Sequence, residues 1–107
     1  MDNPPHSQIL KWSGLIDYQD TSVVSRVIIK SEGGNITLFA FDQGQELSEH
    51  TTPFDALVQV VEGEVEIRIA GQPFLLGIGE SILMPAGVPH AVKAVKNFKM
   101  LLTMIHP

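Results

Sequence analysis

The segment from Gly79 to Val92 combines turn-forming residues, a short apolar run and a histidine more tightly than any other part of the sequence. Pro85, Gly87 and Pro89 prevent regular strand pairing there, so the chain must bend sharply before His90. An imidazole at the end of a rigid bend loses little conformational freedom when it binds something. The segment therefore favours a binding or catalytic role for His90 over a surface role.

Composition limits the classes of function that need to be considered. The chain has 107 residues, which is enough for one domain with one core. It contains no cysteine, so a metal would have to be held by histidine, carboxylate or water. The net charge of -5 argues against nucleic acid as a partner. Short apolar runs, a mean hydropathy of +0.15 and the lack of a basic leader predict a cytoplasmic protein without a membrane partner.

The order of elements predicts an all-β domain preceded by an irregular arm. Residues 1–22 form the arm, in which Trp12 and Tyr18 are expected to anchor the segment on the body or on another subunit. Residues 23–107 form the domain, and Gly, Pro or Asn separates its strand-like runs. Eight short strands with regular turns favour a closed barrel, or a sandwich that dimerises to protect its edges. The eight predicted strands are 23–30, 35–42, 56–61, 65–69, 74–76, 81–84, 90–94 and 98–105.

Two motifs resemble those of the cupin family over roughly residues 23–105. The spacing of Gly79, Pro85, Gly87 and His90 is similar to the whole core of the second cupin motif. The first motif is only partly matched. Gly44, His50 and Gly63 stand at its positions, but Thr52 replaces the expected second histidine, Ala56 replaces the glutamate, and Ala94 stands where the second motif often ends in asparagine.

The resemblance implies a fold and the position of a site. The fold would be a double-stranded β-helix, or jelly roll, with a pocket inside the barrel between the two motifs and frequently a homodimer. Exchanging the histidine for Thr52 and the glutamate for Ala56 would make this pocket larger and more neutral, which suits a small uncharged or anionic ligand. We expect the pocket to be lined by His50, Thr52, Ala56, Met84 and His90.

The chemistry of this pocket stays open at the level of sequence, because the fold hosts many functions. His50 and His90 could hold Fe, Mn, Ni or Zn weakly, without the carboxylate that balances a divalent ion. Glu49 and Asp55 are expected to face the other way, unless a bulge turns one of them inward. The alternatives are a metal-dependent enzyme of the dioxygenase, isomerase or decarboxylase type, a non-catalytic sensor of a small ligand, and an interaction module.

Overall fold

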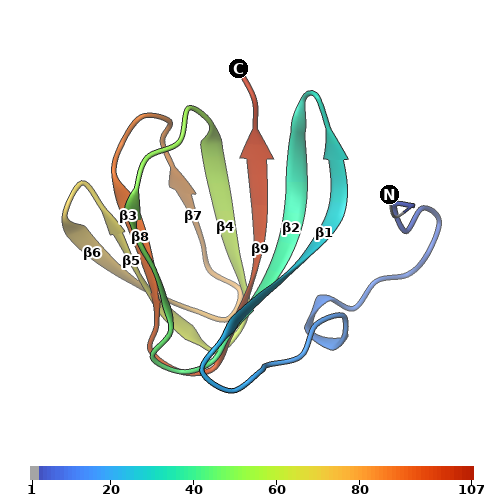
Figure 1. The fold of residues 1–107 in the computed structure, drawn as a ribbon, viewed down its shortest axis with the longest axis horizontal. Coiled ribbons are helices and arrows are strands. Elements are labelled where there is room, and N and C mark those ends of the chain that lie inside the picture. The colour runs from blue at the N-terminus through green and yellow to red at the C-terminus, as the bar shows by residue number, and fades with distance from the viewer. Residues whose placement is uncertain (1–2) are drawn as a thin grey trace.

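The computed structural model describes residues 3–107 and contains nine strands and one short 3-10 helix among them (Figure 1). The sequence analysis predicted eight strands and missed the strand that ends at His50. That strand is polar and largely exposed, so it lacks the apolar run by which the other strands are recognised. The elements are η1 (Trp12–Gly14), β1 (Val23–Ser31), β2 (Gly34–Phe41), β3 (Glu46–His50), β4 (Asp55–Glu62), β5 (Glu64–Ile69), β6 (Gln72–Gly77), β7 (Ser81–Met84), β8 (His90–Ala94) and β9 (Phe98–Ile105).

The strands form two antiparallel sheets that face each other as a jelly roll. The five-stranded sheet has the order β1-β2-β9-β4-β7, and the four-stranded sheet has the order β3-β8-β5-β6. The two sheets converge at the end that carries the β4–β5 turn, which we call the closed end (Figure 1). They diverge at the other end, which carries the C-terminus and the β1–β2 hairpin and which we call the open end (Figure 1). No helix in the described part of the chain is long and apolar enough to cross a membrane.

Apolar side chains from both sheets fill the space between them. Phe41 and Phe98 are fully buried, and their ring centroids lie 5.2 Å apart. Such a pair contributes packing energy beyond the area that it buries. The remaining buried members of this inner core are Ala56, Val58, Val60, Val65, Ile67, Leu76, Met84, Val92, Ala94 and Met100.

The N-terminal arm packs on the outer face of the five-stranded sheet, where it covers a second apolar cluster. Ile16 is buried there, and Trp12 and Tyr18 pack against the cluster. The arm is therefore anchored on the body of the same chain, one of the two possibilities raised by the sequence. The sheet residues of this cluster are Ile28, Leu38, Ala40 and Leu101.

A buried lysine of the five-stranded sheet forms a hydrogen bond with the N-terminal arm. The Nζ of Lys99, which is only 6% exposed, donates to the carbonyl oxygen of Ser13 at 2.7 Å and lies 3.6 Å from a carboxylate oxygen of Glu62. The same ammonium lies 4.8 Å from the centre of the Tyr18 ring, whose hydroxyl donates to Glu62. Burial, reinforced by the Glu62 carboxylate, raises the pKa of Tyr18. The arm is thus held by a paired charge as well as by apolar contact.

Candidate functional site

Two histidines that are 40 positions apart in the sequence meet at the open end of the jelly roll. His50 ends β3 and His90 begins β8, and strand pairing places them opposite each other. The ring centroids are 4.4 Å apart with an interplanar angle of 69°, an edge-to-face arrangement. Because the two strands are neighbours in one sheet, the backbone and not a flexible loop fixes this pair.

Backbone carbonyl groups determine which nitrogen of each ring carries the proton. The Nδ1 of His50 lies 2.8 Å from the carbonyl oxygen of Ser48, and the Nδ1 of His90 lies 3.3 Å from that of Val88. A carbonyl oxygen can only accept a hydrogen bond, so Nδ1 is the protonated nitrogen in the neutral form of each ring. Each Nε2 is then an acceptor. The pair presents two hydrogen-bond acceptors, or two nitrogen ligands, to whatever binds beside it.

The two rings differ in their exposure. His50 is exposed, whereas His90 is only 4% exposed. Burial lowers the pKa of His90, the neighbouring His50 lowers it further, and the hydrogen bond with Val88 opposes both effects. Within residues 3–107, no buried side-chain nitrogen or oxygen lacks a partner. Since Nδ1 is the ring nitrogen with a protein partner, the His90 Nε2 must reach solvent through the open end.

The other three predicted pocket residues lie in two different places. Thr52 links the β3–β4 loop to the β7–β8 loop at the open end. Its hydroxyl donates to the carbonyl oxygen of Phe54 at 3.1 Å, and its own carbonyl oxygen accepts from the Gly87 amide at 2.8 Å. Ala56 and Met84 face each other across β4 and β7 and are both buried in the inner core.

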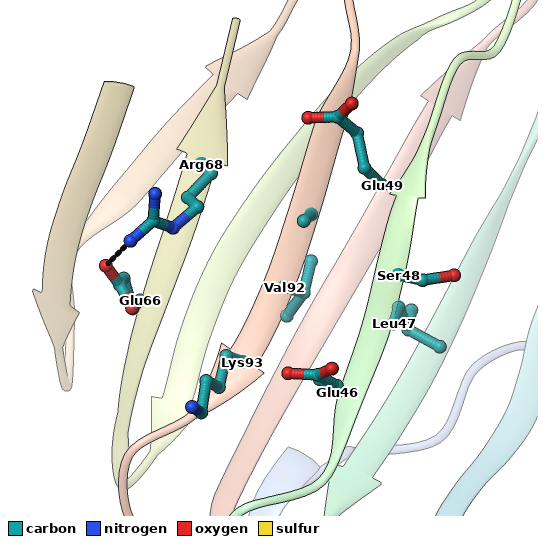
Figure 2. A pocket seen from close by; sticks show the side chains of 9 residues that line it. Glu46, Leu47, Ser48, Glu49, Glu66, Arg68, Val92 and Lys93 are labelled. Atoms are coloured by element: carbon teal, nitrogen blue, oxygen red, sulfur yellow. Dashed lines mark hydrogen bonds and ion pairs between the residues drawn. The ribbon is translucent and has the colours of Figure 1, made fainter. Parts of the chain in front are cut away.

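The carboxylates next to the histidines do not join them. The Asp55 carboxylate accepts a hydrogen bond from the Ala86 amide at 2.9 Å and so stabilises the β7–β8 loop. The pairing of β3 with β8 shifts register between Leu47 and His50, as expected of a bulge, but Glu49 still lines a hollow with Glu46 that opens on the other face of the four-stranded sheet (Figure 2). The bulge therefore supplies no acidic ligand.

The donor set does not fit a resident catalytic metal. Such a site needs about three protein ligands, and two imidazoles are the ones that meet at the open end. Among the residues that the structure describes, no three His, Asp or Glu side chains gather closely enough to hold an ion.

A second aromatic pair, which the sequence analysis did not identify, lies at the open end. The rings of Phe54 and His106 are stacked at a centroid distance of 4.1 Å and an angle of 24°. The His106 Nδ1 lies 2.9 Å from the carbonyl oxygen of Glu32, in the β1–β2 hairpin. The pairing of Asp55 with Ile105 brings the two rings together. Neither ring stands in a recognisable motif, so no local pattern in the sequence signals this contact.

Comparison with known proteins places these features in a wider group. A family model described as a cupin domain matches residues 37–106. A conserved protein of unknown function from Streptococcus pyogenes is 35% identical, with a TM-score of 0.92 over 99% of this chain and 93% of that chain. A cupin superfamily protein from Desulfitobacterium hafniense is 28% identical, with a TM-score of 0.91 over 99% and 97% of the two chains.

A cupin 2 conserved barrel domain protein from Leptotrichia buccalis is 37% identical, with a TM-score of 0.84 over 87% of this chain and 45% of that one. A search of proteins with curated descriptions finds no match.

Proposed function

The chain belongs to the cupin family, and we propose that it binds a small organic molecule at the open end of its barrel. The cupin fold hosts many chemistries, so the support for this proposal comes from the site residues and not from the fold. The observation that carries this proposal is the histidine pair, whose Nδ1 atoms are both engaged by backbone carbonyl groups. The free Nε2 atoms of His50 and His90 then accept hydrogen bonds from the ligand. The ligand class that matches is an uncharged molecule with hydroxyl donors.

The surroundings of the pair support an organic ligand of mixed polarity. Phe54 and His106 stack at the same end of the barrel and add an aromatic surface there, which suits a molecule with one apolar and one donor-bearing side. Anionic ligands match less well near neutral pH, because the lowered pKa of His90 keeps that ring uncharged. The sequence analysis admitted both uncharged and anionic ligands, and the ring geometry favours the uncharged class.

A divalent metal is the competing occupant of the same two nitrogens. Fe, Mn, Ni or Zn bound there would have two protein ligands and would depend on water or a substrate for the remainder of its coordination shell. Without a nearby carboxylate, such binding would be weak and easily reversed. We therefore derive no reaction step through a metal.

The proposal is tested by the ¹⁵N NMR resonances of the imidazole nitrogens. We expect a compound from a panel of monosaccharides and polyols to move the Nε2 resonances of both histidines in ¹⁵N NMR spectra and to raise the midpoint of thermal unfolding. His50→Ala should abolish both responses with little loss of stability, because His50 is exposed. His6→Ala, at an exposed histidine in the arm, is the matched control.

Two outcomes would contradict the proposal. One is a panel in which no compound moves the Nε2 resonances. The other is that Zn²⁺ or Ni²⁺ binds stoichiometrically and tightly while organic compounds act only in its presence. That result would assign the pair to a metal.

A further inference from the structure

His106, which follows β9, is fixed on the β1–β2 hairpin at the open end. Its amide donates to the carbonyl oxygen of Gly33 at 3.0 Å, and its Nδ1 lies 2.9 Å from the carbonyl oxygen of Glu32. The hairpin itself lies tightly against β9, since a Cβ on Gly34 would be only 2.1 Å from the carbonyl oxygen of Met104. The imidazole of His106 is therefore held by backbone groups of the five-stranded sheet.

The ring of His106 extends from this anchor to the β3–β4 loop. It stacks on Phe54 at a centroid distance of 4.1 Å and an angle of 24°. Residues 51–54 form this loop, which crosses from the four-stranded sheet to the five-stranded sheet directly after His50. The stack therefore connects the segment that follows His50 to a fixed point on the other sheet.

Hydrogen bonds continue from Phe54 towards both segments that carry the histidine pair. The Phe54 amide donates to the Thr52 hydroxyl at 3.3 Å, and that hydroxyl donates to the Phe54 carbonyl oxygen at 3.1 Å. The Thr52 carbonyl oxygen accepts from the Gly87 amide at 2.8 Å, and Gly87 lies in the loop that leads to His90. One continuous set of contacts thus joins the stack to the loops beside both histidines.

The two loops depend on such contacts because they are not buried. Every residue of the β3–β4 loop and of the β7–β8 loop, residues 85–89, is exposed or half-buried. The strand that ends at His50 adds little support, since β3 lies at the edge of its sheet and its pairing with β8 shifts register between Leu47 and His50. An edge strand with a bulge has fewer ladder bonds to fix its end. The position of His50 therefore depends on what holds the loop after it.

We propose that His106 is a positioning residue, which holds the β3–β4 loop so that His50 stays opposite His90 in the geometry that binds a ligand. Its effect on affinity rests on the proposed function, whereas its effect on the loop exists without a ligand. A site that is already in its bound arrangement loses less conformational freedom on binding. When the loop is released, fewer molecules are competent to bind, and the apparent dissociation constant rises accordingly.

The exposure of the stacked pair separates this role from one in global stability. Phe54 and His106 are both half-buried, and neither belongs to the inner core. Loss of a contact between two partly exposed rings removes only a small part of the stability of a domain. We therefore expect the loop to loosen in a variant of His106 while the domain stays folded.

Amide hydrogen exchange of the ligand-free protein is the first test. The reporters are the amides of Phe54 and Gly87, which both donate to Thr52. We expect His106→Ala to raise their exchange rates at least about tenfold, because local opening exposes these amides without global unfolding. The amide of Gly79, which donates to a carbonyl oxygen of β4 at 3.0 Å from the β6–β7 turn, should exchange as in the parent protein.

Substitutions at the same position separate the stack from the hydrogen bond. His106→Phe keeps an aromatic ring without the bond to Glu32, and His106→Asn keeps a donor without the ring. We expect exchange rates in His106→Phe to stay close to those of the parent, and rates in His106→Asn to match His106→Ala, because the ring makes the contact with the loop. Ile105→Ala removes an exposed neighbouring side chain and is the matched control.

Ring geometry and affinity are readouts that a merely structural role would not change. In the parent protein, the ring centroids of His50 and His90 are 4.4 Å apart, which is close enough for nuclear Overhauser effects between their protons. His106→Ala should weaken these effects. It should also raise, by at least about threefold, the dissociation constant of the monosaccharide or polyol that moves the Nε2 resonances of the parent.

The proposal is wrong if His106→Ala leaves both reporter amides unchanged, if Ile105→Ala changes them equally, or if a variant with a loosened loop binds with unchanged affinity. If His106→Ala does not fold, Phe54→Leu, which removes the stack from the loop side, decides in its place. The two proposals fail separately. A panel in which no compound binds the parent removes the proposed function, and the exchange rates and ring contacts then decide the role of His106.

Discussion

The two ends of the barrel differ in how far their aromatic side chains are buried. At the closed end, the sheets converge on fully buried aromatic rings and on a glycine turn with no space for a side chain. At the open end, rings also gather, but they are histidines and a phenylalanine that keep contact with solvent or with backbone carbonyl groups. The difference indicates that side chains at the closed end contribute more to the free energy of unfolding, whereas side chains at the open end are available to contact a ligand.

Truncation of one phenylalanine at each end tests this division most strongly. Phe98→Ala removes a fully buried ring from the contact with Phe41 and should lower the free energy of unfolding by about 3–5 kcal/mol. Phe54→Ala removes a partly buried ring that stacks on His106 and should lower it by about 1 kcal/mol. Urea unfolding measures both values. Similar losses from the two variants would mean that the ends do not differ in this way.

The tight turn at Gly63 provides the second test. A Cβ on Gly63 would lie 1.9 Å from the carbonyl oxygen of Asn97, and its φ of 83° is strained for other residues. Gly63→Ala should therefore lower the free energy of unfolding by about 3 kcal/mol. Gly44 has a φ of 86° with nothing near its would-be Cβ, so Gly44→Ala should lose only about 1 kcal/mol. Equal losses would show that backbone strain alone, and not the close approach to Asn97, determines the effect.

More of the structure could be predicted from the sequence at the closed end than at the open end. Apolar strand runs and turn glycines predict the all-β fold and eight of the nine strands in the described part of the chain, because buried strands show a periodic apolar pattern. The strand β3 has no such pattern, since all of its residues except Leu47 are polar and exposed. Nor could spacing show that Glu49 would stay on the outer face of a bulge, or that Phe54 would meet His106. Those outcomes depend on strand register, which long-range pairing fixes.

Protonation of His90 provides a third and smaller test, at the open end. Burial and His50 lower the pKa of His90 in the folded protein below the 6.5 expected when it is unfolded, so the unfolded chain binds the proton more readily. The free energy of unfolding should be highest above about pH 6.5 and should fall as the pH drops through the folded pKa. NMR titration measures that pKa, which His50→Ala should move back towards 6.5. A value at or above 6.5 in the parent protein would contradict the assigned burial.

The smallest expected effect, also at the open end, is a gain in stability at the β5–β6 turn. Ala70 and Gly71 have φ angles of 51° and 81°, the pattern of a turn that favours Asn-Gly and penalises alanine. Ala70→Asn should raise the free energy of unfolding by about 0.5–1 kcal/mol and the melting midpoint by a few degrees.

A matched control separates turn strain from a general effect of asparagine. Ala86→Asn makes the same change in the β7–β8 loop at a residue without a positive φ, and should bring no gain. The Ala70 amide donates to the carbonyl oxygen of Pro89 at 2.8 Å, directly before His90, so the turn braces the segment that presents this ring. Ala70→Asn keeps that bond and should leave ligand binding intact. Weaker binding in a more stable variant would mean that the open end needs motion in this turn to admit its ligand.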